Sequence, residues 1–191
     1  MIQIVDENII LDKTINDLDR FVLDFIKILE RHTRYVIVSG YVSIFFGRSR
    51  GTEDVDCFIE LKSSEILTEL WSDITRSFEC MNCSSAKQWE ELIHDGISLR
   101  FCRKGVFIPN MEVKIVKSFL DKVSLERRIK VQFGGEELWM SPIELQIAYK
   151  RKILCSEKDM EDARHLESAL RDVISLEKIK YYESVIDTYG S

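Results

Sequence analysis

Apolar residues recur at helical spacing in some stretches of the chain and form short β-branched runs in others. The first apolar face predicts a helix over residues 14–31, capped by Thr14. A β-branched run predicts a buried strand at 35–40 that ends at Gly40, and a short helix that stops near Gly47 should follow it. Two further helices are expected, at 64–79 and from Ser85 to about His94.

Strand patterns dominate the middle of the chain, and helical patterns follow them. Strands are predicted at 54–60, 97–103, 110–116, 128–133 and 136–140, with a hairpin turn at Gly134-Gly135. Ser141 and Pro142 predict the start of the first of three helices, at 142–154, 157–171 and 175–187. This order predicts an α/β (α+β) fold with a mixed sheet. Residues 1–140 should form the core, and residues 141–191 a helical subregion packed on it.

Composition limits the cellular compartments and the classes of partner that are expected for this protein. The 191 residues are 45% hydrophobic, and the five cysteines have no regular spacing, which is typical of a reducing cytoplasm. The start of the chain has no basic segment that would indicate a signal peptide, and no apolar run is long enough to predict a membrane span. The net charge is -6, yet residues 100–152 hold 12 Lys and Arg against 6 Asp and Glu. Such a basic section can attract phosphates or can be an ordinary mixed surface.

The residues best suited to chemistry lie between two of these strands. Asp54 and Asp56 are two apart on a strand, so their carboxylates should project from the same face. Mg²⁺ or Mn²⁺ could neutralise such a pair and hold nucleotide phosphates. Gly40, at a strand–helix junction, could let a phosphate approach backbone N–H groups. Two solvated acids at the start of a strand are the alternative interpretation.

The spacing of these residues resembles that of the polymerase-β-like nucleotidyltransferase superfamily. The sequence has Gly40, then Gly47-Arg48-x-Arg50-x-Thr52, then Asp54-x-Asp56, a form most similar to the small prokaryotic branch that contains AbiEii-type toxins. A second block, residues 141–166, is similar to the C-terminal pattern of that branch, with Lys150, Asp159 and Asp162 at the matching positions. Together the two blocks span about residues 35–166.

The resemblance implies roles for individual residues. Asp54 and Asp56 would bind metal, and Glu112, on a neighbouring strand, would be the third carboxylate unless it belongs to the exposed face of an edge strand. Lys150 would contact donor phosphates, although it could be a solvated lysine, and its replacement by alanine is expected to leave the fold intact. Asp159 would orient Lys150 or a metal, or begin a helix.

Further residues would surround the phosphates. Arg48 and Arg50 could contact phosphate or pair with Asp54. The turn departs from the superfamily pattern because Tyr41 replaces the usual small residue after the glycine. Tyr41 could stack on a base or close the pocket. The small residue that it replaces is often a serine in the superfamily, and Ser39 and Ser43 could supply that hydroxyl instead.

The function that the resemblance implies is transfer of a nucleoside monophosphate from an NTP to an acceptor hydroxyl, with Mg²⁺ or Mn²⁺ as cofactor. The acceptor would be an RNA end or a protein, and an antitoxin is a possible partner. Two alternatives remain: a non-catalytic nucleotide- or RNA-binding protein on the same fold, and an interaction module.

Overall fold

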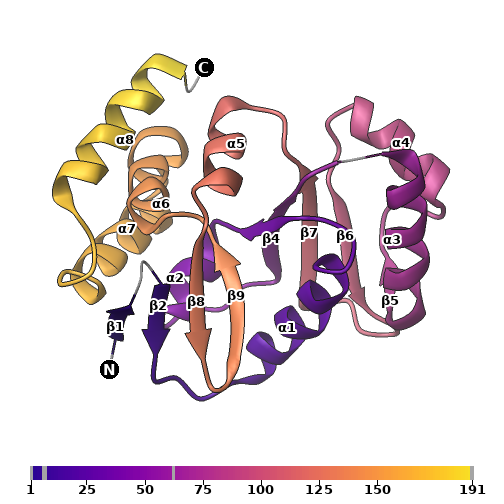
Figure 1. The fold of residues 1–191 in the computed structure, drawn as a ribbon, viewed down its shortest axis with the longest axis horizontal. Coiled ribbons are helices and arrows are strands. Elements are labelled where there is room, and N and C mark those ends of the chain that lie inside the picture. Colours follow the sequence, from indigo (N-terminus) through magenta and orange to yellow (C-terminus); the bar gives the residue numbers. More distant parts are fainter. Residues whose placement is uncertain (1, 6–7, 62, 190–191) are drawn as a thin grey trace.

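The computed structural model describes residues 2–5, 8–61 and 63–189 and confirms a mixed α/β fold (Figure 1). The described strands form one sheet in the order β1-β2-β8-β9-β3-β4-β7-β6-β5. In chain order they are β1 (Ile2–Val5), β2 (Asn8–Leu11), β3 (Tyr35–Ile37), β4 (Asp54–Ile59), β5 (Phe78–Cys80), β6 (Leu99–Arg103), β7 (Asn110–Ile115), β8 (Ile129–Phe133) and β9 (Glu136–Met140). The pairs β2–β8, β3–β9 and β4–β7 are parallel, and the other neighbours are antiparallel.

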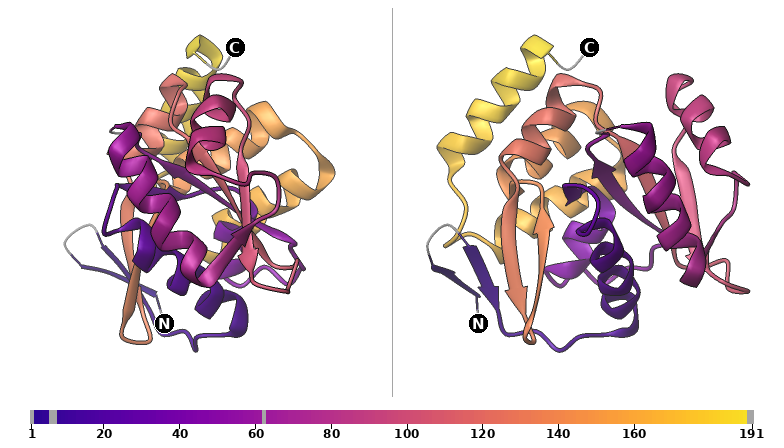
Figure 2. Two further views of the ribbon diagram at one scale, coloured as in Figure 1. Left: turned by 90° about the vertical axis from the view of Figure 1, so that its right-hand side faces the viewer. Right: turned by 45° about the vertical axis from the view of Figure 1, so that its right-hand side comes forward.

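Helices cover both faces of this sheet (Figure 2). They are α1 (Asp17–Leu29), α2 (Gly40–Phe45), α3 (Ser64–Ser77), α4 (Ala86–His94), α5 (Phe119–Glu126), α6 (Ile143–Tyr149), the π-helix η1 (Lys150–Leu154), α7 (Glu157–Ala169) and α8 (Leu176–Tyr189). On one face, Phe25 of α1 packs edge-on against Phe78, with ring centroids 5.0 Å apart, and Trp71 of α3 packs against Phe101. On the other face, α5 and α6 stand over β4, and a pocket lies between them and the strand.

Local sequence accounts for most of these elements. Gly134 and Gly135 both have positive φ, so they form the tight turn between β8 and β9 that was predicted. Helix α1 begins later than expected, because the side chain of Asn16, rather than Thr14, accepts from the backbone N–H of Asp19. Asp19 completes the capping box by accepting from the N–H of Asn16.

Several predicted boundaries are wrong. Ser141 does not cap α6, because its hydroxyl is buried against Ser124 and the cap position is Pro142. The helix predicted at 142–154 is divided, since its last turn is the π-helix η1. The strands β1, β2 and β5 and the helix α5 were not predicted. Strand β7 lies between β4 and β6, so it is not an edge strand.

The boundary predicted at residue 140 falls between β9 and α6. Residues 1 and 190–191, at the outer ends of the two predicted ranges, lie outside the described residues. Within the described part of the chain, no helix is both long and apolar enough to cross a membrane.

Candidate functional site

Strand β4 presents two carboxylates on the face that is turned toward α5 and α6. Val55, Cys57 and Ile59 are buried on the opposite face, while Asp54 and Asp56 are half-buried. The alternation of a strand therefore places both acids on one face, as the sequence predicts. The hydroxyl of Thr52 donates to the carbonyl of Asp54 at 2.8 Å and lies 3.3 Å from its carboxylate, which orients this side chain.

The parallel register of β4 and β7 places a third carboxylate beside this pair. Asp56 is the Cα partner of Glu112, whose residue is 9% exposed. Ser98 Oγ donates to Glu112 Oε1 at 2.8 Å, and Arg100 donates to Oε2 at 3.1 Å. Glu112 thus lies next to Asp56, on an interior strand, with its own hydrogen-bond donors.

Lys114, which sequence reasoning assigned no role, bridges two of these acids. Its Nζ lies 2.7 Å from Asp56 Oδ1 and 3.0 Å from Glu112 Oε1. Burial lowers the pKa of Lys114, but the attraction of Asp56 and Glu112 outweighs burial and leaves that pKa above its usual value. For Glu112 the effects have the opposite sign. Burial raises its pKa, but the hydrogen bonds from Lys114 and Ser98 outweigh burial, so the pKa of Glu112 lies below its usual value. The ammonium and the carboxylate therefore remain charged at neutral pH.

The donor set fits a divalent cation only in part. Asp54 and Asp56 offer hard carboxylate oxygens on one face, as Mg²⁺ requires, and Asp54 makes no ion pair with any described residue. Glu112 does not complete a cluster here, since no group of three acidic, histidine or cysteine side chains in the described ranges is arranged to hold a metal. The two aspartates could hold one ion, and Glu112 could join them only if Lys114 moved.

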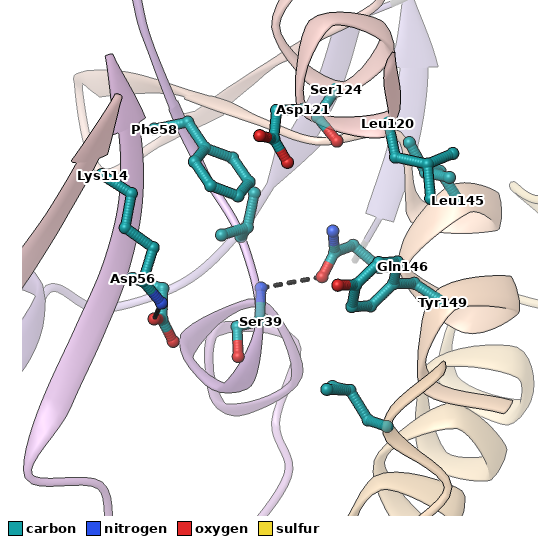
Figure 3. Close-up of a pocket in the computed structure, with 12 residues that line it drawn as sticks. Ser39, Asp56, Phe58, Lys114, Leu120, Asp121, Ser124, Leu145, Gln146 and Tyr149 are labelled. Carbon is teal, nitrogen blue, oxygen red and sulfur yellow. Dashed lines mark hydrogen bonds and ion pairs between the residues drawn. The ribbon is translucent and has the colours of Figure 1, made fainter. Parts of the chain in front are cut away.

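A pocket of about 140 Å³ opens beside Asp56, between the sheet and the helices (Figure 3). Asp56, Phe58 and Lys114 line it from the sheet. The other lining residues come from the turn after β3 and from α5, α6 and η1: Val38, Ser39, Leu120, Asp121, Ser124, Leu145, Gln146, Tyr149 and Leu154. Polar and aromatic groups thus meet beside Asp56, while Asp54 and Glu112 do not line this pocket.

The turn after β3 is held in an unusual backbone conformation at this pocket. Ser39 has φ 66° and ψ -136°, a region that non-glycine residues rarely adopt. Its backbone N–H donates to Gln146 Oε1 at 2.7 Å, so a side chain from α6 fixes the turn. The hydroxyl of Ser43 is fully buried and has no hydrogen-bond partner among the described residues. Ser39 lines the pocket, whereas Ser43 does not.

Gly40 is needed for a close approach, but the group that approaches it is a side chain of the protein. A Cβ at Gly40 would lie 2.4 Å from Nη2 of Arg50. The guanidinium of Arg50 in turn binds both oxygens of Asp162, at 3.2 and 3.0 Å. Arg48 pairs with Asp162 and Glu161. The predicted alternative that these arginines pair with Asp54 is therefore wrong.

Asp162 joins the two blocks of sequence that carry the resemblance. It is 0% exposed and receives Lys150 Nζ at 3.0 Å in addition to Arg50. Lys150 is itself 1% exposed and lies 3.5 Å from Asp159, so the interpretation as a solvated lysine is wrong. Contact between Lys150 and a donor phosphate would require its ammonium to leave this network.

Tyr41 lies in the core rather than in the pocket. It is 0% exposed, its ring packs against Phe45, and its hydroxyl donates to Asp19 Oδ1 at 2.8 Å. The side chain points away from the turn after β3 toward α1, so the prediction that Tyr41 stacks on a base or closes the pocket is wrong. The departure from the superfamily turn does not obstruct the site.

This placement leads to a testable prediction for Tyr41→Phe. The change removes one buried hydrogen bond to a charged acceptor, so the free energy of unfolding should fall by about 1.5–3 kcal/mol. The stabilisation by Mg²⁺ and NTP that the sequence resemblance implies, measured by thermal melting, should be the same in the variant as in the wild type. Tyr181→Phe, at a half-exposed position on α8, is the control. Loss of the nucleotide effect with an unchanged melt of the free protein would place Tyr41 in the pocket instead.

Signals in the sequence could have revealed some of the residues that were missed. Lys114 is two residues from Glu112, so strand alternation places both on one face. Ser118 and Asp121 form a capping box that marks the start of α5, the helix that brings Asp121 to the pocket. Gln146 and Asp162 act through partners distant in the sequence, and no local pattern identifies such pairs.

The fold is similar to that of solved protein structures. No family model matches the chain, and no curated protein matches it. An antigenic nucleotidyltransferase-like protein from Paracoccidioides brasiliensis superposes with a TM-score of 0.53 at 15% identity, over 88% of this chain and 86% of its own. The antibiotic-resistance factor ANT(2'')-Ia superposes with a TM-score of 0.53 at 13% identity, over 91% of this chain and 94% of its own. At these identities the comparison establishes the fold alone, and that fold is nucleotidyltransferase-like.

Proposed function

We propose that this protein is a metal-dependent nucleotidyltransferase that moves a nucleoside monophosphate from an NTP to an acceptor hydroxyl and releases pyrophosphate. The observation that carries the proposal is the position of Asp54 and Asp56. They share a face of β4, next to Glu112, and Asp56 lines a pocket between the sheet and α6. The fold and the similarity of the two sequence blocks to the superfamily support the same activity.

Different residues of the chain would have different roles in such a reaction. Asp54 and Asp56 would hold Mg²⁺ or Mn²⁺, which when bound neutralises charge on the transferred phosphoryl group. Glu112, beside Asp56, would accept the proton of the acceptor hydroxyl once Lys114 has left it. Gln146 holds the turn at Ser39 against the pocket, and Phe58 and Tyr149 provide aromatic surface for the donor. Arg48, Arg50 and Lys150 lie behind this turn, where Asp162, Glu161 and Asp159 balance their charges, and each would have to leave these carboxylates to contact a phosphate.

The acceptor and the partner belong to this proposal. The basic section at 100–152 favours an RNA end over a protein hydroxyl. The role of a toxin that pairs with an antitoxin rests on the AbiEii-type resemblance. One observation favours the rival function of a non-catalytic nucleotide-binding protein: Lys114 already neutralises Asp56 and Glu112.

Binding of Mg²⁺ and NTP is the first test. Ligand at 100 times its Kd should stabilise the folded protein by about 2.7 kcal/mol, which thermal melting resolves. NTP with EDTA and Mg²⁺ alone serve as controls, and Asp54→Asn/Asp56→Asn should abolish the gain. Coincident melts of the wild type with and without millimolar Mg²⁺–NTP would rule out the site.

A further inference from the structure

The ammonium of Lys114 occupies a specific position among the carboxylates. Lys114 and Glu112 are two residues apart on β7 and share a face, and Asp56 is the register partner of Glu112 on β4. The Nζ of Lys114 therefore lies between the acids, 2.7 Å from Asp56 and 3.0 Å from Glu112. The side chain of Lys114 is 39% exposed, against 18% for Asp56 and 11% for Glu112, so the lysine covers the acids from the pocket side.

The two acids depend on Lys114 to different degrees. Glu112 keeps the donors Arg100 and Ser98 when Lys114 is removed. For Asp56, Lys114 is the one cation within ion-pair distance among the residues that the structure describes. Loss or movement of Lys114 therefore leaves Asp56, and not Glu112, without a countercharge.

A divalent cation bound to Asp56 would lie close to the ammonium of Lys114, which is 2.7 Å from Oδ1 of the same carboxylate. Carboxylate oxygens bind Mg²⁺ and Mn²⁺ directly, and two positive charges on one carboxylate repel each other. Lys114 also lines the pocket, so an ammonium that leaves Asp56 can turn toward an anionic group bound there. Glu112 gains a free oxygen position at the same moment.

We propose that Lys114 is the resident countercharge of Asp56 and Glu112, which a divalent cation displaces and which then binds a phosphate of the donor nucleotide. This inference rests on the proposed function for the identity of the metal site and of the donor. Lys114 is thus a binding residue that couples the two ligands. Metal alone binds weakly because it displaces the lysine, and nucleotide strengthens metal binding because it gives the displaced ammonium a new partner.

The test measures Mn²⁺ binding by electron paramagnetic resonance, with and without a non-hydrolysable NTP analogue. For Lys114→Gln, Mn²⁺ alone should bind about three- to tenfold more tightly than to the wild type, and the strengthening by nucleotide should shrink by a similar factor. Lys114→Arg should restore the wild-type pattern in part. Lys130→Gln, which breaks a comparable Lys–Glu pair on β8 and β9, is the matched control and should change neither value.

The outcomes separate this inference from the proposed function. If the wild type and Lys114→Gln bind Mn²⁺ with equal affinity, the inference is overturned and the metal site stands. If only Lys114→Gln binds Mn²⁺ without nucleotide, and the wild type binds it once the NTP analogue is present, the inference is supported; if the wild type binds it in neither condition while Lys114→Gln does, displacement of the lysine is overturned. If neither binds Mn²⁺ at about 10 mM, while circular dichroism shows both to be folded, the metal site and the inference both fail.

Discussion

Replacing Asp162 with alanine is expected to lower the free energy of unfolding by about 3–5 kcal/mol, a large part of the stability of a single domain. Asp162 is fully buried and receives Arg50 and Lys150, and Arg48 lies 3.4 Å away. Its loss leaves Lys150, which is 1% exposed, beside the two arginines that shared Asp162, with Asp159 as the one described carboxylate within ion-pair distance. Urea unfolding of the wild type and the variant measures the effect.

A matched control lies on the same two elements. Glu167 of α7 pairs with Arg151 of η1, where the side chains are 33% and 26% exposed, so Glu167→Ala should cost no more than about 1 kcal/mol. If the free energy of unfolding fell by the same small amount in both variants, the stabilising role of the buried network would be contradicted. Lys150→Ala should also destabilise the protein, but less than Asp162→Ala, because Arg50 still binds both carboxylate oxygens. The expectation from sequence that this change leaves the fold intact does not hold for a buried lysine.

The same carboxylate predicts a pH dependence. Burial raises the pKa of Asp162, but the hydrogen bonds from Arg50 and the attraction of Lys150 outweigh burial and bring it below the ordinary 3.8. A lowered pKa in the folded state means that the stabilisation is complete above the unfolded value and is lost as pH falls through the folded one. Wild-type stability should therefore fall more steeply below pH 3.8 than that of Asp162→Asn, which acid titration followed by circular dichroism can measure.

Nucleotidyl transfer should fall by at least about 10³-fold in Asp54→Asn/Asp56→Asn. The amides keep the shape of the side chains but are poor ligands for Mg²⁺, so the charge that develops on the phosphoryl group is not neutralised. The structure corrects one expectation from sequence, that relief of repulsion keeps the stability of the free protein level or raises it. Asp56 already pairs with Lys114, so stability should fall slightly, by no more than about 1 kcal/mol for this partly exposed pair.

Glu53→Gln is the control for this variant. Glu53 is exposed, directly precedes β4 and does not line the pocket. The control should retain both transfer and stability. If the double variant and Glu53→Gln transferred nucleotide at the same rate, Asp54 and Asp56 would have no part in the reaction.

Sequence predicted the elements whose signals are local. The alternation around Asp54 and Asp56, the cap at Ser85 and the turn at Gly134-Gly135 are all present where expected. The strands that were missed, β1, β2 and β5, have three or four residues each, too few for a period-2 pattern to emerge. Strands β2 and β5 depend on pairing with β8 and β6, which come later in the chain, and β1 in turn pairs with β2.

The positions of site residues could be predicted where residue type and strand face determine them. They could not be predicted where a side chain's position depends on a partner distant in the sequence. Lys150 stands in the run Lys150-Arg151-Lys152, which looks solvated until Asp162 is brought to it from α7. Tyr41 follows the glycine of the turn, and only the position of Asp19 on α1 shows which way its ring points. Pairwise burial of this kind is a tertiary property that no short pattern encodes.

The central claim is the transfer of a nucleoside monophosphate, and the fate of labelled phosphates tests it most directly. The protein would be incubated with Mg²⁺, total RNA and NTPs that carry the label in either the α- or the γ-phosphate. Label from the α-phosphate should appear in the acceptor, and label from the γ-phosphate should appear in pyrophosphate. Transfer of the γ-label to the acceptor would indicate a kinase, and transfer of neither label to RNA or to a protein acceptor would contradict the enzymatic account.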